Sequence, residues 1–224
     1  MSKNVKKKDE FANVEQVLST SEAFIEKYQK QILIAVCAIV AIVLLALAVR
    51  NFYIKPREVA AENEMYRAQV HFANGAFEQA LNGDNFETIG FRAIAASYRM
   101  TSSGNLATAY AGISYFRLGD YQNAIKFLSK FRGRDAYLAT SVIGLIGDSY
   151  VQLGEIQKAI GFFEKAAGAK NTVLSPIYLK KAGLAYESLG QMDKAARSFQ
   201  AIKDLYPTSQ EAADIEKYIA RVTR

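Results

Sequence analysis

The chain has 224 residues, half of them hydrophobic and 22% charged, and its formal net charge is +6. The single cysteine excludes an internal disulfide, and the presence of only three prolines favours helices over a sandwich of short strands. The basic residues are spread along the chain instead of forming a stripe with stacking aromatic residues, which argues against nucleic acid as a partner.

The first predicted segment, residues 1–31, is a tail with six lysines and five acidic residues. Phe11, Val14, Val17 and Leu18 fall near one face if this tail is helical. Two interpretations follow: a frayed tail with a few apolar residues, or a short amphipathic helix that lies on the membrane or on a partner.

The second segment, residues 32–54, is predicted to be a transmembrane helix. Residues 32–49 are 18 apolar residues without a charge, and as a helix they span about 27 Å, close to the ~30 Å of a bilayer core. The run is longer than the ~7–15 apolar residues of a signal peptide, and 31 residues precede it. We therefore expect an uncleaved anchor in which Cys37 is simply an apolar group.

The charges nearest the anchor do not decide its orientation, because Lys27 and Lys30 on one side face Arg50, Lys55 and Arg57 on the other. Long domains are translocated largely regardless of their charge, whereas short basic tails tend to stay in the cytoplasm. We therefore expect a single-pass protein with its N-terminus in the cytoplasm and its C-terminal domain on the other side of the membrane.

Three fragments with one common pattern follow: "LGDYQNAIKFL" at 118–128, "LGEIQKAIGFF" at 153–163 and "LGQMDKAARSF" at 189–199. Relative to the glycine of each fragment, four positions recur: a glycine seven residues before, a tyrosine four before, an alanine five after and a large apolar residue nine after. In chain order the shared small and aromatic positions are Gly112, Tyr115, Gly119 and Ala124; Gly147, Tyr150, Gly154 and Ala159; and Gly183, Tyr186, Gly190 and Ala195. A period of 35 or 36 residues is typical of stacked helix pairs.

Each repeated position has a mechanical interpretation. The first glycine lets the two helices of a pair approach closely, and we expect the tyrosine to fill the gap beside it. The second glycine ends the first helix in the left-handed conformation, and the alanine marks the crossing of the two helices. We expect Leu128, Phe163 and Phe199 to seal the contact with the next pair.

This pattern resembles the tetratricopeptide repeat (TPR), which implies an all-α fold: one transmembrane helix followed by a TPR α-solenoid. The resemblance covers residues 105–207 as three units, with Pro207 at the end of the last. Residues 55–104 are expected to form a degenerate first unit, with inserted residues in loops at 83–91 and 100–107, and residues 208–224 a C-terminal capping helix. Lys55-Pro56 is expected to kink or restart the helix that leaves the membrane.

The sequence predicts no catalytic, cofactor or metal site and no small-molecule substrate, because His71 is the only histidine and no ligand cluster is visible. A binding surface is the remaining possibility. First-helix positions outside the repeat signature would line the concave side of a solenoid, and they form the candidate groove: Leu106, Ile113, Phe116, Arg117, Asp148, Val151, Lys180 and Glu187. The alternative is that such residues simply pack against neighbouring units, above all Ile177 and Leu184 near the C-terminal helix.

The arrangement of tail, anchor and repeats is similar to ancillary translocon subunits of the YfgM type, in the version found in Bacteroidota. "FEQALNGD" and "GNLATAYAGISYFRLGDYQNAIKFL" carry this resemblance. It implies a non-enzymatic protein of the bacterial inner membrane, with its C-terminal domain in the periplasm. The implied partners are the Sec channel SecYEG, a periplasmic chaperone of the PpiD type and newly exported client chains. The rival interpretations are a membrane-tethered TPR scaffold of another envelope assembly or secretion machine, and a cytoplasm-facing adaptor if the orientation is inverted.

Overall fold

The computed structural model describes residues 27–84 and 88–224. The predicted amphipathic helix of the tail lies in residues 1–26, outside the described residues. The chain divides into two compact units, Met1–Lys55 and Pro56–Arg224, which are described separately below. Across the described ranges the backbone is almost wholly helical and contains no strand, apart from one isolated bridge between Gly83 and Ile89.

The apolar part of the first unit forms a helix that no other described residue buries. Residues 27–48 are α-helical, and the large apolar side chains from Ile32 to Val49 are between 40% and 68% exposed. Among the described residues, this is the one helix long and apolar enough to cross a membrane. Its apolar side chains lie on every face and are not buried, and its length and composition are those of a membrane span.

The predicted kink at Lys55-Pro56 takes the form of a widened turn. Val49–Ile54 form the π-helix η1, and the amide of Lys55 donates to the carbonyl of Arg50, five residues back. Pro56 has no amide hydrogen, and its ring would collide with the carbonyl four residues earlier in a regular helix. A π-helical turn relieves this conflict while the chain remains helical.

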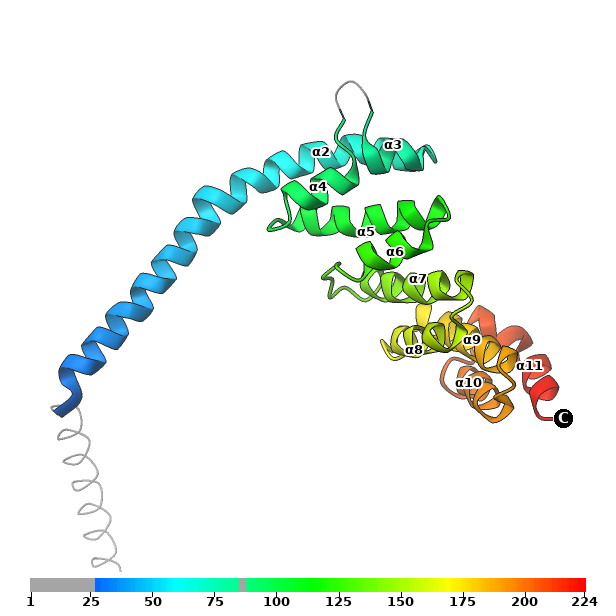
Figure 1. Cartoon of the computed structure of the whole chain (residues 1–224). Helices are drawn as coiled ribbons and strands as arrows, with labels where there is room; N and C mark the ends of the chain where they lie inside the picture. The colour runs from blue at the N-terminus through cyan, green and yellow to red at the C-terminus, as the bar shows by residue number, and fades with distance from the viewer. Residues whose placement is uncertain (1–26, 85–87) are drawn as a thin grey trace, which may run out of the picture. The chain divides into compact units, whose positions relative to one another are not determined.

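The second unit is a series of helices joined by short turns (Figure 1). In chain order they are α2 (Lys55–Ala73), α3 (Phe77–Asn82), α4 (Phe91–Ser97), α5 (Ser102–Arg117), α6 (Tyr121–Leu128), α7 (Leu138–Gln152), α8 (Ile156–Ala167), α9 (Leu174–Ser188), α10 (Met192–Leu205), η2 (Gln210–Asp214) and α11 (Ile215–Val222). Each of the pairs α5–α6, α7–α8 and α9–α10 is one helical hairpin, and successive hairpins stack on one another.

Of the two loops expected in residues 55–104 and the start of the next helix, the structure contains one. A loop begins at Gly83 as expected, and it separates α3 from α4. The second predicted loop, 100–107, is wrong, because α5 already begins at Ser102. Thr101 caps this helix by accepting from the amide of Gly104, and Glu58 of α2 accepts from the amides of Ser102 and Ser103 at 2.7 and 2.8 Å. These acceptors satisfy the first turn of α5, so the helix starts earlier than the small polar residues suggest.

The core runs along the stack as a chain of apolar clusters. Phe91 and Ile94 of α4 are fully buried with Ala107 and Ala111 of α5. Further along, Leu128 packs with Val142 and Ile146, and the last cluster places Phe199 with Ile215 and Val222 of α11. Each cluster takes residues from neighbouring hairpins, so every hairpin depends on the next for burial of its apolar side chains.

Candidate binding surface

The repeated first glycines each lie against a large side chain from the second helix of their own hairpin. A Cβ on Gly112 would lie 2.6 Å from Cγ of Leu128. The matching distances are 2.6 Å from Gly147 to Cε1 of Phe163 and 2.4 Å from Gly183 to Cε1 of Phe199. These large residues therefore fill the space beside their own glycine as well as meeting the next hairpin, where Phe163 stacks on Tyr178 at 6.4 Å between ring centroids.

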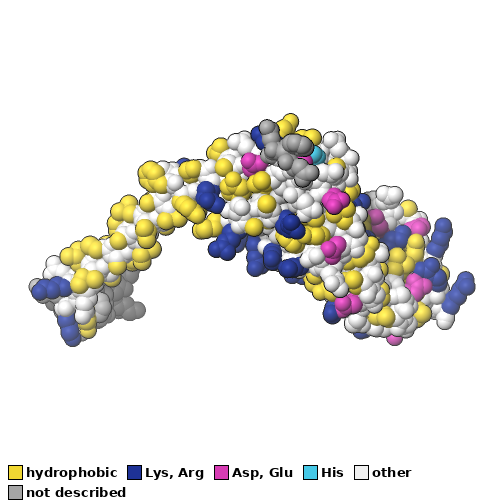
Figure 2. Space-filling view, turned by 45° about the horizontal axis from the view of Figure 1, so that its top comes forward, with side chains coloured by type: hydrophobic (Ala, Val, Ile, Leu, Met, Phe, Trp, Pro, Cys, Tyr) yellow, Lys and Arg dark blue, Asp and Glu magenta, His cyan; other side chains and the backbone are white. Residues whose placement is uncertain are grey.

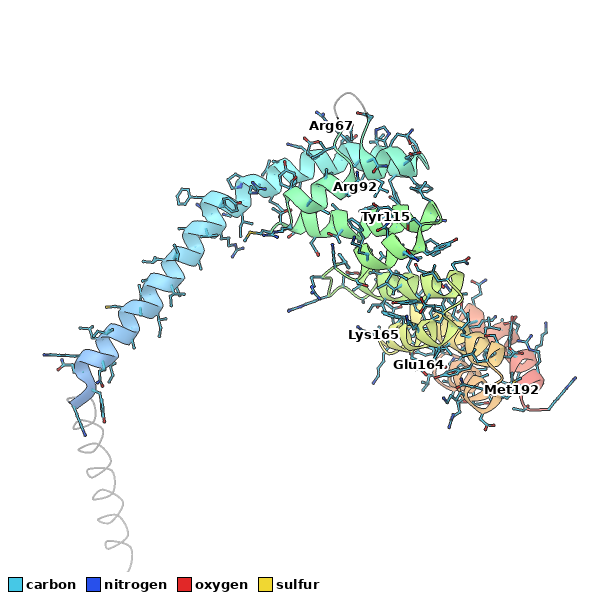
Figure 3. All side chains as sticks on the ribbon, viewed as in Figure 1. Arg67, Arg92, Tyr115, Glu164, Lys165 and Met192 are labelled. Carbon is cyan, nitrogen blue, oxygen red and sulfur yellow. The ribbon has the colours of Figure 1, made fainter. Side chains whose placement is uncertain are left out.

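The repeated tyrosines were expected to fill the space beside the first glycine of each hairpin, and this expectation is wrong, because the large apolar residues occupy that space. Tyr115 lies between α5 and α6 beside Phe127, with 5.2 Å between ring centroids (Figure 3). Tyr150 lies beside Phe162 at 5.4 Å. Tyr186 is 7% exposed and its hydroxyl donates to Oε1 of Glu164 at 2.6 Å. Burial, followed by this hydrogen bond, raises the pKa of Tyr186 to about 12.

The turn glycines and the crossing alanines agree with the prediction. The four glycines that end first helices, Gly75, Gly119, Gly154 and Gly190, have φ between +70° and +80°. This left-handed conformation is costly for any other residue. Ala124, Ala159 and Ala195 are 0% exposed, as a close helix crossing requires.

The groove residues of the first full hairpin are mostly half-buried. Leu106 packs against the cluster around Phe91, and Ile113 and Phe116 pack against the cluster around Leu128. Phe116 also meets the ring of Tyr121 edge-on at 5.5 Å. Arg117 is exposed. This part of the candidate groove is a shallow apolar surface with one cation at its end.

The middle of the candidate groove contains a hollow of about 330 Å³. Asp148 and Val151 of α7, Ile156 and Phe163 of α8, and Lys181, Leu184, Ala185 and Ser188 of α9 line it. Nζ of Lys181 lies 2.7 Å from Oδ2 of Asp148, so one ion pair stands at an otherwise apolar site. The sequence interpretation selected Lys180 and missed Lys181, although its helical spacing from Leu184 could have indicated it.

The other end of the candidate groove is covered by the chain itself. Nζ of Lys180 lies 2.8 Å from Oδ1 of Asp214 and 4.5 Å from the ring centre of Tyr218. Arg221 reaches Oε2 of Glu187 at 2.6 Å. Lys180 and Glu187 therefore hold the C-terminal residues and do not line an open groove, whereas Leu184 remains 40% exposed.

No catalytic arrangement stands out among the described residues. His71 lies 3.3 Å from Oδ2 of Asp84 and so contacts the loop after α3. Within the described ranges there is no group of three or more His, Cys, Asp or Glu side chains that could hold a metal ion.

Comparison with known proteins supports the repeat assignment. Models of the tetratricopeptide repeat match residues 110–135 and 179–209, and another matches residues 140–172. Similar solved structures include a MamA protein, with 18% identity over 73% of this chain and 86% of that chain and a TM-score of 0.53. MamA from Desulfovibrio magneticus RS-1 has 17% identity over 73% and 93%, with a TM-score of 0.51.

A third similar structure is that of the TPR-like repeats of a Podosopora anserina kinesin light chain, with 14% identity over 72% and 84% and a TM-score of 0.53. At these identities the likeness shows the fold alone. No curated protein sequence matches the chain significantly.

Proposed function

We propose that this chain is a non-enzymatic, membrane-tethered binding subunit, because it contains tetratricopeptide repeats and its described residues include one helix apolar enough to cross a bilayer. The observation that supports this proposal is that the chain has both an exposed apolar helix and a hollow at Asp148, Val151 and Leu184. The helix supplies attachment to a membrane, and the hollow supplies an apolar anchor point for a partner segment.

The specific machine we propose is the bacterial Sec translocon, with the N-terminal tail in the cytoplasm and the repeats in the periplasm. On this proposal the tail and anchor associate laterally with SecYEG, and the repeat domain binds a periplasmic chaperone of the PpiD type. The protein would then assist newly exported chains as they leave the channel. The resemblance in sequence arrangement supports this choice, and the repeat fold is compatible with it.

Purification of the tagged full chain from membranes in mild detergent tests the proposal. We expect SecYEG and the chaperone to be recovered together with it. A matched variant replaces residues 32–49 with an unrelated apolar span of equal length, which should retain the chaperone and lose the channel. Recovery of a different stable envelope complex without SecYEG would replace this proposal with the scaffold alternative.

Orientation is tested separately in spheroplasts. Trypsin added outside should cut the repeat domain at exposed Arg117, at the end of α5, or at exposed Lys203, in the last turn of α10. Protection of these sites in intact spheroplasts, with cleavage after lysis, would place the repeats in the cytoplasm and contradict the periplasmic assignment.

A further inference from the structure

Basic residues are concentrated in the segments that precede the first helices and are absent from the three-residue turns within the hairpins. The basic edge, here called the loop edge, consists of the segments that precede the first helices: residues 98–101, 129–137 and 168–173. They contain five basic residues, Arg99, Lys130, Arg132, Arg134 and Lys170, against one acid, Asp135. The turns within the hairpins at 118–120, 153–155 and 189–191 contain two acids and no basic residue.

Side-chain hydrogen bonds hold the loop edge together as one surface. Nδ2 of Asn105 donates to the backbone carbonyl of Arg132 at 3.0 Å, and Oδ1 of Asn105 accepts from the backbone amide of Arg132 at 2.9 Å. One unit further, Nδ2 of Asn171 donates to the carbonyl of Ala136 at 3.2 Å. These contacts lie near the starts of consecutive first helices, so they fix the spacing of the basic segments. Figure 2 shows Lys and Arg side chains gathered along one side of the repeat domain.

The cations of the loop edge are available to a ligand. Arg99, Arg132 and Arg134 are exposed, and no acidic side chain of the described residues pairs with them. Asp135 is already engaged, since its carboxylate accepts from the backbone amides of Tyr137 and Leu138. With five basic residues against this one acid, the loop edge keeps a net positive charge.

Apolar side chains stand beside these cations at repeated positions. Met100, Tyr137 and Val173 are 57%, 61% and 54% exposed, and each lies at or just before the start of a first helix. A hollow of about 440 Å³ adds an apolar floor that includes Phe131, Ile143 and Phe162, and Arg132 and Lys165 also line it. Cations interleaved with apolar and aromatic groups suit the headgroup region of a bilayer better than water or a purely acidic surface.

Arg57, a few residues after the apolar run, contacts the start of the loop edge. Arg57 follows Val49, the last residue of the apolar run, by eight residues, which span at most about 28 Å even when fully extended. The Arg57 guanidinium donates to the carbonyl of Ser97 and lies 5.4 Å from the ring centre of Tyr98. The loop edge therefore begins at the point where the chain enters the repeat domain.

We propose that the loop edge docks on anionic phospholipid headgroups, so that the repeat domain lies on the membrane surface in a fixed orientation. Arg99, Arg132, Arg134 and Lys170 contact phosphates, and Tyr137 and its neighbours enter the headgroup region. The attraction between basic side chains and anionic lipids supplies much of the binding, and it weakens with salt. This inference rests on the proposed membrane tether and is independent of which machine the protein serves.

The absence of tryptophan from the chain gives a direct test. Full-length protein with Tyr137→Trp is reconstituted into vesicles of phosphatidylcholine with or without phosphatidylglycerol, and its fluorescence is quenched by acyl-brominated lipid. The matched control is Met192→Trp. Met192 is 44% exposed at the start of α10, and Figure 3 shows it distant from Lys165, which lines the hollow of the loop edge. Circular dichroism confirms the helical fold of each variant.

We expect the tryptophan at position 137 to be quenched at least twofold more in phosphatidylglycerol vesicles than in phosphatidylcholine alone, and the one at 192 to be unaffected. When Arg132→Gln and Arg134→Gln are added to the Tyr137→Trp protein, the difference in quenching between the two kinds of vesicle should disappear. Adding Lys158→Gln and Lys194→Gln, near the hairpin turns, should leave this difference unchanged. Equal quenching at 137 and 192, or no dependence on anionic lipid, would overturn the docking proposal. Flotation with the vesicles tests the tether separately, since the anchor should hold every variant.

Discussion

Phe163 occupies the space that the missing side chain of Gly147 leaves open, and a Cβ at Gly147 would lie 2.6 Å from Cε1 of its ring. The ring is 2% exposed and stacks on Tyr178 of the next hairpin, so it has little room to withdraw. The missing side chain at Gly147 therefore affects two distances. One is the distance between α7 and α8, and the other is the distance between this hairpin and α9.

We expect Gly147→Ala to destabilise the folded repeat domain by about 1–3 kcal/mol, the usual cost of overpacking a filled core. The control is Gly161→Ala in α8, because a Cβ there meets no atom within 4 Å. Alanine favours the helix by about 0.5–1 kcal/mol over glycine, so this control should stabilise slightly. Thermal unfolding of the full chain in detergent, followed by circular dichroism, measures both. Equal effects of the two substitutions would contradict the packing argument.

A second prediction concerns acid stability and Glu58. Burial alone would raise the pKa of Glu58, but hydrogen bonds from Ser103 and Ser102 outweigh burial and hold the pKa below its ordinary value of 4.5. A carboxyl group with a lowered pKa stabilises the fold above its unfolded pKa, and this contribution is lost as pH falls through the folded value. We expect Glu58→Gln to cost about 1 kcal/mol at pH 7, as for loss of a helix cap, and progressively less below pH 4.5.

Glu62 of α2 provides the matched control for this experiment, because it is exposed one turn further along the same helix. Glu62→Gln should leave the unfolding temperature unchanged at both pH values. If Glu58→Gln were as costly at pH 3 as at pH 7, the charged form of Glu58 would not be what stabilises the start of α5.

A third prediction concerns alkaline stability and Tyr186. Its pKa is raised to about 12, so the protonated hydroxyl stabilises the fold below the ordinary tyrosine pKa of 10.0, and this contribution is lost as pH rises toward 12. We expect Tyr186→Phe to cost about 1 kcal/mol at pH 8 through the lost bond to Glu164. The difference from wild type should narrow between pH 10 and 12 in urea-unfolding curves. Tyr137→Phe, which alters an exposed side chain, should show neither effect.

The repeated framework could be predicted because each of its positions depends on a property of one residue. A left-handed turn requires a glycine, as at Gly119 and Gly154, and a close crossing requires a small side chain, as at Ala159. Such requirements recur with the period of the fold and are therefore visible in the sequence. The same holds for the apolar helix, because a bilayer imposes a length and a composition.

The parts that differ from prediction depend on contacts between distant residues. The early start of α5 needs Glu58, which lies 44 residues before Ser102, and no local pattern contains this relationship. The closure of the groove at Lys180 and Glu187 depends on where Asp214 and Arg221 return to the stack. The hollow contains Lys181 and not the predicted Lys180, because the side chains of neighbouring residues on a helix point about 100° apart.

The final prediction tests the hollow at Leu184 as a partner site. Leu184 is 40% exposed and lies beside the ion pair of Asp148 and Lys181, so a buried partner side chain would meet apolar walls at that point. Leu184→Glu places a charge there. It should reduce recovery of the proposed chaperone partner at least tenfold, which corresponds to about 1.4 kcal/mol of binding free energy.

The stability of the fold should not change with Leu184→Glu, because the replaced side chain is partly exposed in the free protein. Leu205→Glu is the matched control: it makes the same substitution at a leucine that is 68% exposed at the end of α10, outside the hollow. We expect this control to retain the partner in co-purification from detergent. Loss of the partner in both variants would indicate a general effect of added charge. Retention in both variants would show that the hollow is not part of the binding surface. The half-buried side chains of Ile113 and Phe116 would then be the next surface to test.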